Sequence, residues 1–395
     1  MHNNDALSRR RLLASVAAWA AIPNQERSMF AYVGTYTGAG GNGKGIYLFR
    51  FDLKTGALTQ IKVVSEIPSP GWLAIHPNGK YLYAANEVSH FNGARTGSVT
   101  ALAIDRSTGD LSLLNVVSSQ GAGPAHLSVD PLGQFVFVAN YGGGSIAVFP
   151  VQPNGSLGDP TDVHTNTGSV GSTKPTNAPP GSFAISGHEA PHAHMIQADP
   201  AGRFVFSTDL GQDRIYTWIL NRPTGKLTAN NPPFVSVPPG DGPRHFVFHP
   251  SGRFFYSLQE EASTLLAYDY SPSNGALAHK QTLSTLPAKF TGTSFTSELR
   301  ISQDGKFIYA ANRLADTIAV FSVGASGALT RVGEASTHGD YPRSFTLDPT
   351  GKFLVSCNQR SDALTTFRIE AKGSKLAFTG EYTPVGSPAI IVFLP

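Results

Sequence analysis

Short runs of alternating apolar and polar residues recur along the chain, and each is followed by a turn and a strongly β-forming segment. One such unit reads HFVFHPSGRFFYSLQE, from His245 to Glu260. Its start predicts a strand, His-Pro-Ser-Gly predicts a tight turn, and the aromatic run after the turn predicts a second strand. The unit is therefore interpreted as a β-hairpin.

Two turn motifs repeat along the sequence. The hairpin turn occurs six times, beginning at His76, Asp130, Asp199, His249, Ser302 and Asp348. A second turn of the type TGAL occurs seven times, beginning at Thr55, Thr108, Asn154, Thr224, Asn274, Ser326 and Gly373. A third strand lies between the two turn types, and a fourth follows the second turn. Four strands in a period of roughly 50 residues are typical of a β-propeller blade.

The two ends of the repeat region account for a seventh blade. SPAIIVFLP at the C-terminus has the pattern of a first strand without a second, whereas MFAYVGTYT has that of a second strand without a first. Pairing them leaves no open sheet edge at the seam. We therefore expect an all-β fold in which residues 29–395 form a seven-bladed β-propeller with four antiparallel strands per blade. The interval from Asp162 to Pro191, rich in Gly, Thr, Pro and Ser, is expected to be a loop.

Residues 1–28 lack the repeat pattern. Arg9 to Arg11 precede a short apolar stretch, Leu12 to Ile22, which is too short to span a bilayer. This arrangement is typical of a cleaved export signal, and the arginines resemble a twin-arginine signal. The sequence therefore predicts a periplasmic or secreted protein with no membrane association after cleavage. The alternative is a basic tail on a cytoplasmic protein.

Composition narrows the function classes. The chain has 395 residues, a net charge of +3 and no long run of Lys or Arg, so binding to nucleic acid has no electrostatic basis. The single cysteine, Cys357, excludes an internal disulfide and a cysteine-cluster metal site. In the run HEAPHAH, His192 and His194 would share a strand face, but no further ligands are identified, so no metal is expected. No phosphate-binding loop, dinucleotide fingerprint or nucleophile elbow occurs in a fitting context, and no cofactor is expected.

A propeller brings the start of each first strand and the end of each second strand to the same end of its central channel, called the channel mouth below. The candidate site residues at these positions are His126, His192, His194, Arg244, His245, Glu260, Arg300 and Arg343. Several guanidinium groups around one opening favour a small anionic ligand, and His and Glu supply acid/base capacity. The structural alternatives are packing roles for single histidines and a simple salt bridge between Arg244 and Glu260.

Five segments carry a family resemblance: SPGWLAIHPNGKYLYAANE, NYGGGSIAVFPV, HAHMIQADPAGRFVFSTDLGQDRI, GPRHFVFHPSGRFFYSLQE and SELRISQDGKFIYAANR. Together they resemble the lactonase family of seven-bladed propellers, which contains 6-phosphogluconolactonases and fungal carboxy-cis,cis-muconate cyclising enzymes. The resemblance implies lactone chemistry without a cofactor. It also implies catalytic roles for four residues, which are His194, Glu260, Arg244 and Arg300. His126, His192, His245 and Arg343 are then expected to bind the substrate.

Three functional hypotheses follow. The first is a carboxylic ester hydrolase acting on a sugar lactone such as 6-phosphogluconolactone, in which arginines stabilise the oxyanion and His194 or Glu260 activates water. The second is cyclisation of an unsaturated diacid to a muconolactone. The third is a non-catalytic propeller that binds a ligand or protein in the periplasm. An export signal argues against a sugar phosphate as substrate, because such compounds are cytoplasmic.

Overall fold

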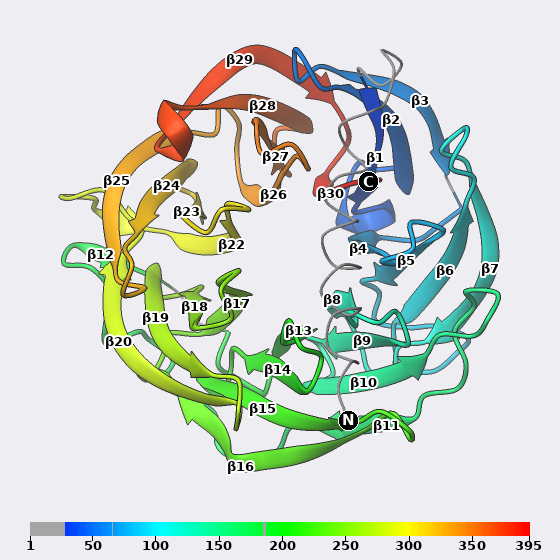
Figure 1. Cartoon of the computed structure of the whole chain (residues 1–395), viewed down its shortest axis with the longest axis horizontal. Helices are drawn as coiled ribbons and strands as arrows, with labels where there is room; N and C mark the ends of the chain where they lie inside the picture. The colour runs from blue at the N-terminus through cyan, green and yellow to red at the C-terminus, as the bar shows by residue number, and fades with distance from the viewer. Residues whose placement is uncertain (1–27, 65, 185–186) are drawn as a thin grey trace, which may run out of the picture.

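A ring of seven four-stranded antiparallel sheets surrounds a central channel (Figure 1). This computed structural model describes residues 28–64, 66–184 and 187–395. The predicted seven-bladed β-propeller is thereby confirmed. The predicted export signal lies outside the described residues except for Ser28, which begins strand β1.

Six blades consist of consecutive strands, running from the channel outward. The first blade contains β4 (Pro70–Ile75), β5 (Tyr81–Asn86), β6 (Ser98–Ile104) and β7 (Leu111–Ser118). The second contains β8 (Pro124–Val129), β9 (Phe135–Asn140), β10 (Ser145–Pro150) and β11 (Asp162–Thr165). The third contains β13 (Ala193–Ala198), β14 (Phe204–Asp209), β15 (Arg214–Asn221) and β16 (Lys226–Ser236). The fourth blade contains β17 (Pro243–Phe248), β18 (Phe254–Gln259), β19 (Thr264–Ser271) and β20 (Ala276–Ser284). The fifth contains β22 (Phe295–Ile301), β23 (Phe307–Arg313), β24 (Thr317–Val323) and β25 (Leu329–Ser336). The sixth contains β26 (Pro342–Leu347), β27 (Phe353–Asn358), β28 (Ala363–Glu370) and β29 (Lys375–Pro384).

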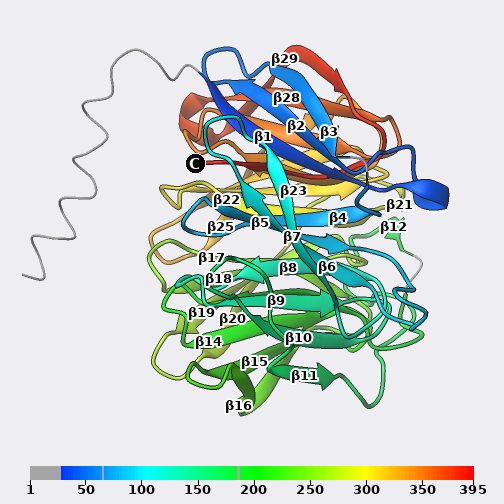
Figure 2. The ribbon, with the colours of Figure 1, turned by 90° about the vertical axis from the view of Figure 1, so that its right-hand side faces the viewer.

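The seventh blade joins the two ends of the propeller. Its strand order is β3-β2-β1-β30, so the C-terminal strand β30 (Pro388–Phe393) lies innermost and pairs with β1 (Ser28–Thr35). β2 (Ile46–Asp52) and β3 (Leu58–Val64) complete the sheet. The predicted closure of the ring by N- and C-terminal strands is confirmed, and Figure 2 shows the blades stacked side by side around the ring.

The prediction of a loop from Asp162 to Pro191 is wrong at its start. Residues Asp162–Thr165 form β11, the outermost strand of its blade. A four-residue edge strand with alternating polar residues is too short to give a clear pattern in the sequence. Further along, β12 (Ser182–Phe183) pairs in parallel with β21 (Gly292–Thr293). The insertion is thus attached to a loop that comes 110 residues later, Ser182 pairing with Gly292.

The two repeated turn motifs meet between neighbouring blades. Gly155, in the second turn of one blade, has a φ of 86°, and a Cβ there would lie 2.3 Å from the ring of Tyr81 in the preceding blade. Its carbonyl accepts a hydrogen bond of 3.0 Å from the hydroxyl of Tyr83. The same glycine-on-aromatic contact, with Cβ distances of 2.3 to 2.8 Å, occurs at all seven interfaces, through Gly56, Gly109, Gly155, Gly225, Gly275, Gly327 and Gly373. Glycine is required at this position because its left-handed backbone and the adjacent ring both exclude a side chain.

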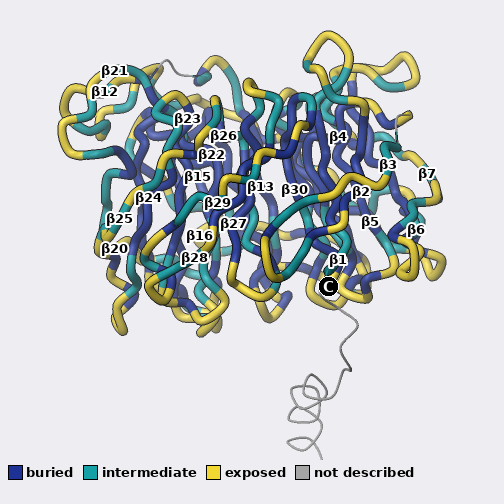
Figure 3. The backbone as a smooth tube through the Cα atoms, turned by 90° about the horizontal axis from the view of Figure 1, so that it is seen from above, coloured by how far each residue is buried: buried dark blue, intermediate teal, exposed yellow. Residues whose placement is uncertain are grey.

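Aspartate side chains stabilise three of the hairpin turns. Asp199 accepts hydrogen bonds from the backbone N–H groups of Arg203 and Phe204, at 2.7 and 3.0 Å, and Asp130 and Asp348 do the same in their own turns. Figure 3 shows that the strands are largely buried, whereas exposed residues concentrate in the loops at the two faces. Within the described ranges the only helices are two three-residue turns, η2 (Gly38–Gly40) and η3 (Ala371–Gly373), and none could cross a membrane.

Candidate active site at the channel mouth

Every innermost strand carries one extra residue near the channel mouth. In β17, Pro243 pairs with Gln259 and His245 pairs with Leu258, so Arg244 is the additional residue. Equivalent register shifts occur in the other six blades, in β4, β8, β13, β22, β26 and β30. Such a bulge interrupts the alternation of a strand and redirects side chains. Two consecutive residues, Arg244 and His245, therefore both lie near the channel axis.

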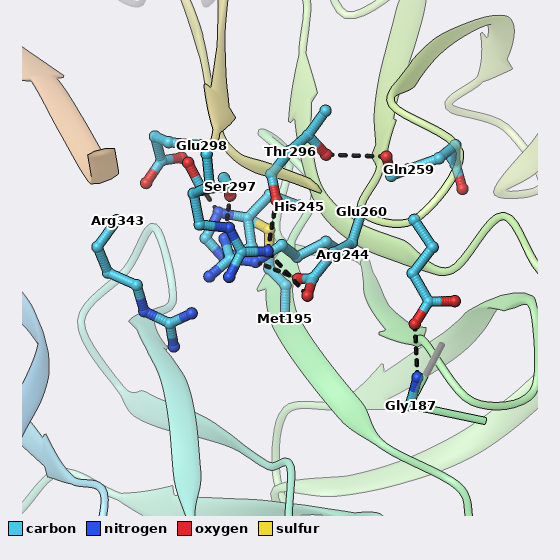
Figure 4. Close-up of polar contacts among 12 residues, drawn as sticks. Gly187, Met195, Arg244, His245, Gln259, Glu260, Thr296, Ser297, Glu298 and Arg343 are labelled. Carbon is cyan, nitrogen blue, oxygen red and sulfur yellow. Dashed lines mark hydrogen bonds and ion pairs between the residues drawn. The ribbon is translucent and has the colours of Figure 1, made fainter. Parts of the chain in front are cut away.

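Arg244, Glu260 and Arg313 form a buried charged cluster at the mouth. The Nε of Arg244 and the Nη2 of Arg313 each lie 2.8 Å from a different carboxylate oxygen of Glu260. Burial alone raises the pKa of Glu260, but the charges of Arg313 and Arg244 outweigh burial and hold its pKa below the usual value. Glu260 is consequently ionised at neutral pH. Figure 4 shows Arg244 among Glu260, Ser297 and His245.

Arg343 lies two blades further round the ring than Arg244, in a second cluster. Its Nε donates a hydrogen bond of 3.0 Å to the hydroxyl of Tyr36, and Tyr36 donates one of 2.7 Å to Glu87. The Nη2 of Arg343 lies 3.8 Å from the same carboxylate oxygen of Glu87. Within these two clusters, three guanidinium groups, of Arg244, Arg313 and Arg343, share two carboxylates, those of Glu260 and Glu87. This excess of guanidinium groups over carboxylates favours an anionic ligand or intermediate.

His194 is the extra residue of β13, at the position that Arg244 occupies in β17. Burial, followed by the charge of Arg244, lowers its pKa well below the usual value, so the ring is neutral. Its Nδ1 is buried and has no hydrogen-bond partner within the described ranges. The ring of Tyr141 lies edge-on to it, with centroids 5.6 Å apart. A neutral imidazole with a free nitrogen can accept a proton.

His192 does not share the channel-facing side of the strand with His194, contrary to the sequence-based expectation. It precedes β13 and stacks on Tyr141, with ring centroids 4.2 Å apart. Both of its ring nitrogens are engaged, one with the carbonyl of Tyr141 at 2.9 Å and the other with Glu189 at 3.0 Å. The bulge that begins at Ala193 removes the alternation on which the expectation relied.

His126 and His245 lie one layer below the mouth instead of in it. Their rings and that of Trp72 contact one another, with centroid distances of 4.6 to 5.6 Å. Burial lowers the pKa of His126 to about 3 and that of His245 well below the usual value. Both rings are therefore neutral, and both line the cavity that also contains Arg300. The expected contact of these two histidines with a substrate at the mouth is not what the geometry shows.

Arg300 is also separated from the mouth. It lines a cavity of about 620 Å³ at the other end of the channel, together with Trp72 and residues of the hairpin turns such as Pro77 and Pro349. Its guanidinium lies 5.8 Å from the centroid of Trp72 and 3.5 Å from Glu298. β22 begins at Phe295, so Arg300, near the other end of the strand, lies further along the channel than the residues of the mouth. The sequence-based placement of Arg300 beside Arg244 is thus wrong.

The structure brings four further residues to the mouth: Tyr36, Glu87, Tyr141 and Arg313. All four directly follow or end a second strand, in the position that Glu260 occupies in its own blade. That shared position at the end of the repeat was the signal available in the sequence. Among the described residues no cluster of three or more His, Cys, Asp or Glu has the arrangement of a metal site.

Comparisons with known proteins agree with this architecture. The family described as "Lactonase, 7-bladed beta-propeller" matches residues 30–393. A 6-phosphogluconolactonase of Bacillus subtilis is 37% identical over 320 residues, which cover 81% of this chain and 85% of the relative. One from Formosa agariphila is 33% identical over 324 residues, which cover 81% and 86%. The solved periplasmic gluconolactonase of Pseudomonas aeruginosa superposes with a TM-score of 0.81 at 31% identity, covering 93% of this chain and 99% of that one.

Proposed function

Because the chain belongs to the lactonase family of seven-bladed β-propellers, we propose that it is a carboxylic ester hydrolase that opens a sugar lactone of the gluconolactone type at the channel mouth. The observation that supports this proposal is the convergence of Arg244, Arg313 and Arg343 on one opening beside a neutral histidine. Relatives named 6-phosphogluconolactonase and gluconolactonase supply the substrate class.

In the proposed reaction a water molecule attacks the lactone carbonyl, and the negative charge that develops on the carbonyl oxygen is stabilised by guanidinium groups. Arg244 and Arg343 supply positive charge from two different blades. His194, whose imidazole is neutral, accepts the proton of the attacking water. The tetrahedral intermediate collapses by breaking the bond to the ring oxygen, which takes the proton from His194. Glu260 stays ionised and orients Arg244 and Arg313.

Hydrolysis assays with purified protein test the proposal directly. Glucono-1,5-lactone and its 6-phosphate are offered separately, and acid release above the spontaneous rate is followed at constant pH. Turnover of either lactone supports the proposal and identifies the substrate. Turnover of neither, with ligand binding retained, favours a non-catalytic binding propeller instead, and formation of a lactone from a carboxymuconate favours a cyclising enzyme.

The pH dependence of the reaction tests the role of His194. Burial lowers the pKa of this imidazole below its ordinary value of 6.5. The neutral form is the one that accepts a proton, so protonation abolishes activity only below that lowered pKa. We expect kcat/KM to stay constant from neutral pH down to pH 6.5 and to fall only in more acidic buffer. A decline that is already half complete at pH 6.5 would assign the base to another group.

Arg313 and Arg300 offer a matched comparison, because they lie in the same blade but at opposite ends of the channel. We expect Arg313→Met to lower kcat/KM about tenfold more than Arg300→Met, because Arg313 donates to Glu260 in the mouth. Steady-state kinetics of both variants, with thermal unfolding as a control for folding, measure this difference. A larger loss in the Arg300 variant would contradict the greater role assigned to Arg313.

The location of the protein is a separate proposal. We infer that it is exported, because Arg9 to Arg11 and the apolar stretch after them have the pattern of an export signal. The periplasmic gluconolactonase of Pseudomonas aeruginosa gives a precedent for a family member outside the cytoplasm. Fractionation of cells that express the full chain tests this inference, and retention of the protein with cytoplasmic markers would contradict it.

A further inference from the structure

Arg244 reaches the mouth from a buried position, and three different groups hold its guanidinium. Besides the contact with Glu260, its Nη1 donates a hydrogen bond to the carbonyl oxygen of Ser297. The same Nη1 lies 3.1 Å from Nε2 of His245. Only 2% of the Arg244 side chain is exposed, so these contacts determine where its positive charge points.

The contact between Arg244 and His245 fixes which nitrogen of the imidazole carries the proton. A guanidinium has only N–H donors, so Nε2 of His245 must be the acceptor. In a neutral imidazole the other nitrogen then holds the proton. Burial and the charge of Arg244 keep the ring neutral by lowering its pKa. The proton of His245 is therefore on Nδ1.

Glu298 accepts a hydrogen bond from this Nδ1–H group. Its Oε1 lies 3.1 Å from Nδ1 of His245, and it also accepts a hydrogen bond of 2.9 Å from the backbone N–H of Leu299. Only 2% of the Glu298 and His245 side chains is exposed. Because Glu298 belongs to the neighbouring blade, the line of contacts from Glu298 through His245 to Arg244 crosses a blade interface (Figure 4).

The rings around His245 restrict its movement but do not select its tautomer. Trp72, His126 and His194 contact it edge-on, with ring centroids 5.1, 5.6 and 5.2 Å away. Edge-on ring contacts at these distances restrain orientation without exchanging a proton. Among the described residues, Arg244 and Glu298 are the groups that hydrogen-bond to the two nitrogens of this ring.

We propose that Glu298 is a positioning residue for the reaction: it holds His245 in the Nδ1–H tautomer and thereby directs the guanidinium of Arg244 into the mouth. The proposal rests on the proposed hydrolase function, and it adds a residue that does not itself touch the substrate. Carboxylates that orient an imidazole in this way determine which nitrogen faces the next group in the chain. An acceptor at residue 298 is the essential property, so an amide oxygen can replace the carboxylate.

Two substitutions distinguish the loss of a hydrogen-bond acceptor at residue 298 from a change in the size of its side chain. In Glu298→Gln the amide oxygen still accepts from both Nδ1 of His245 and the N–H of Leu299. In Glu298→Met the side chain keeps a similar length but leaves the Nδ1 proton without an acceptor. We expect Glu298→Met to lower kcat by about 10- to 100-fold with little change in KM, because Arg244 is displaced from its productive position. Glu298→Gln should retain most of the wild-type kcat.

The matched control is Ser344→Ala, which removes a buried hydrogen bond, from Oγ to the carbonyl of Ala389 at 2.7 Å, at the same strand position in the next blade. This variant should keep the wild-type kcat, and the unfolding temperatures of all variants show whether a loss of activity follows a loss of folding. Equal losses of kcat in Glu298→Gln and Glu298→Met, or none in either, would overturn the proposal.

A spectroscopic measurement tests the tautomer without relying on turnover. In protein labelled with ¹⁵N-histidine, the signal that disappears in His245→Gln identifies the ring. We expect its Nε2 to be unprotonated in the wild type and in Glu298→Gln, and the tautomers to mix in Glu298→Met. A proton on Nε2 in the wild type would refute the proposed role of Glu298 even if the protein hydrolyses lactones. Conversely, lack of lactone turnover with the expected tautomer would refute only the proposed function.

Discussion

Arg244→Lys is expected to lower kcat for lactone hydrolysis by about 100- to 1,000-fold while changing KM much less. The guanidinium of Arg244 bridges Glu260, the carbonyl of Ser297 and His245 at once. A lysine ammonium has the same charge but is a single point at the end of a flexible chain, so it cannot reproduce that fork. A loss confined to kcat would show that the interaction is made mainly in the transition state.

Arg253→Lys is the matched control for this experiment. Arg253 lies at the turn of the same hairpin, at the opposite face, and is exposed beside the ring of Phe254. It should keep the wild-type kcat and KM. Steady-state kinetics of both variants measure the loss of kcat, and thermal unfolding shows whether each variant is folded. If Arg244→Lys hydrolyses the lactone at the wild-type rate, then Arg244 supplies only charge or structure.

Glu260→Gln should be the most destabilising substitution in the mouth. Arg244 and Arg313, whose side chains are 2% and 4% exposed, would lose their shared counter-charge while remaining buried. Removing one partner of a buried ion pair costs about 3–5 kcal/mol, and we expect a value near 3 because Glu260 itself is 17% exposed. Catalysis should also be lost, since the two guanidinium groups then repel each other.

Urea unfolding of Glu260→Gln and of a control, Asp110→Asn, measures this cost. Asp110 pairs with Lys62 at the surface, where both side chains are more than 40% exposed, and its loss should cost less than about 1 kcal/mol. In the double variant Glu260→Gln/Arg313→Gln one unpaired charge is gone, so part of the stability should return without activity. Equal stability of Glu260→Gln and Asp110→Asn would contradict a buried charged cluster.

The propeller could be derived from the sequence because its signals are local. A turn such as that at Asp199 is encoded by a few neighbouring residues, and counting the repeats gave the number of blades and the pairing of β1 with β30. The contact that joins the two motifs, such as Gly155 against Tyr81, could not be derived in the same way. It links different blades, and no spacing within one repeat reveals it.

The site was predicted less well, for a definable reason. Alternation along a strand assigns each residue to one side, but the bulges place Arg244 and His245 together near the channel axis. Arg300 lines the far cavity because it lies near the end of β22 that is away from the mouth. A bulge has no reliable signature in a single sequence. The ion pair between Arg244 and Glu260 that the sequence suggested is observed, because a single hairpin carries both residues.

The seam of the ring has a consequence for how the protein folds. Tyr36, which follows β1, reaches Glu87 in the next blade and Arg343 in the blade before the seam. The contact with Arg343 joins residues 307 positions apart and spans the seam, where β30 pairs with β1. Pairing of segments so distant in sequence is slow, because the loop must close before any contact stabilises it. Closure of the seam therefore brings Arg343 to Tyr36 and completes the ring of side chains at the mouth, so a change that weakens the pairing of β1 with β30 would also disturb the mouth.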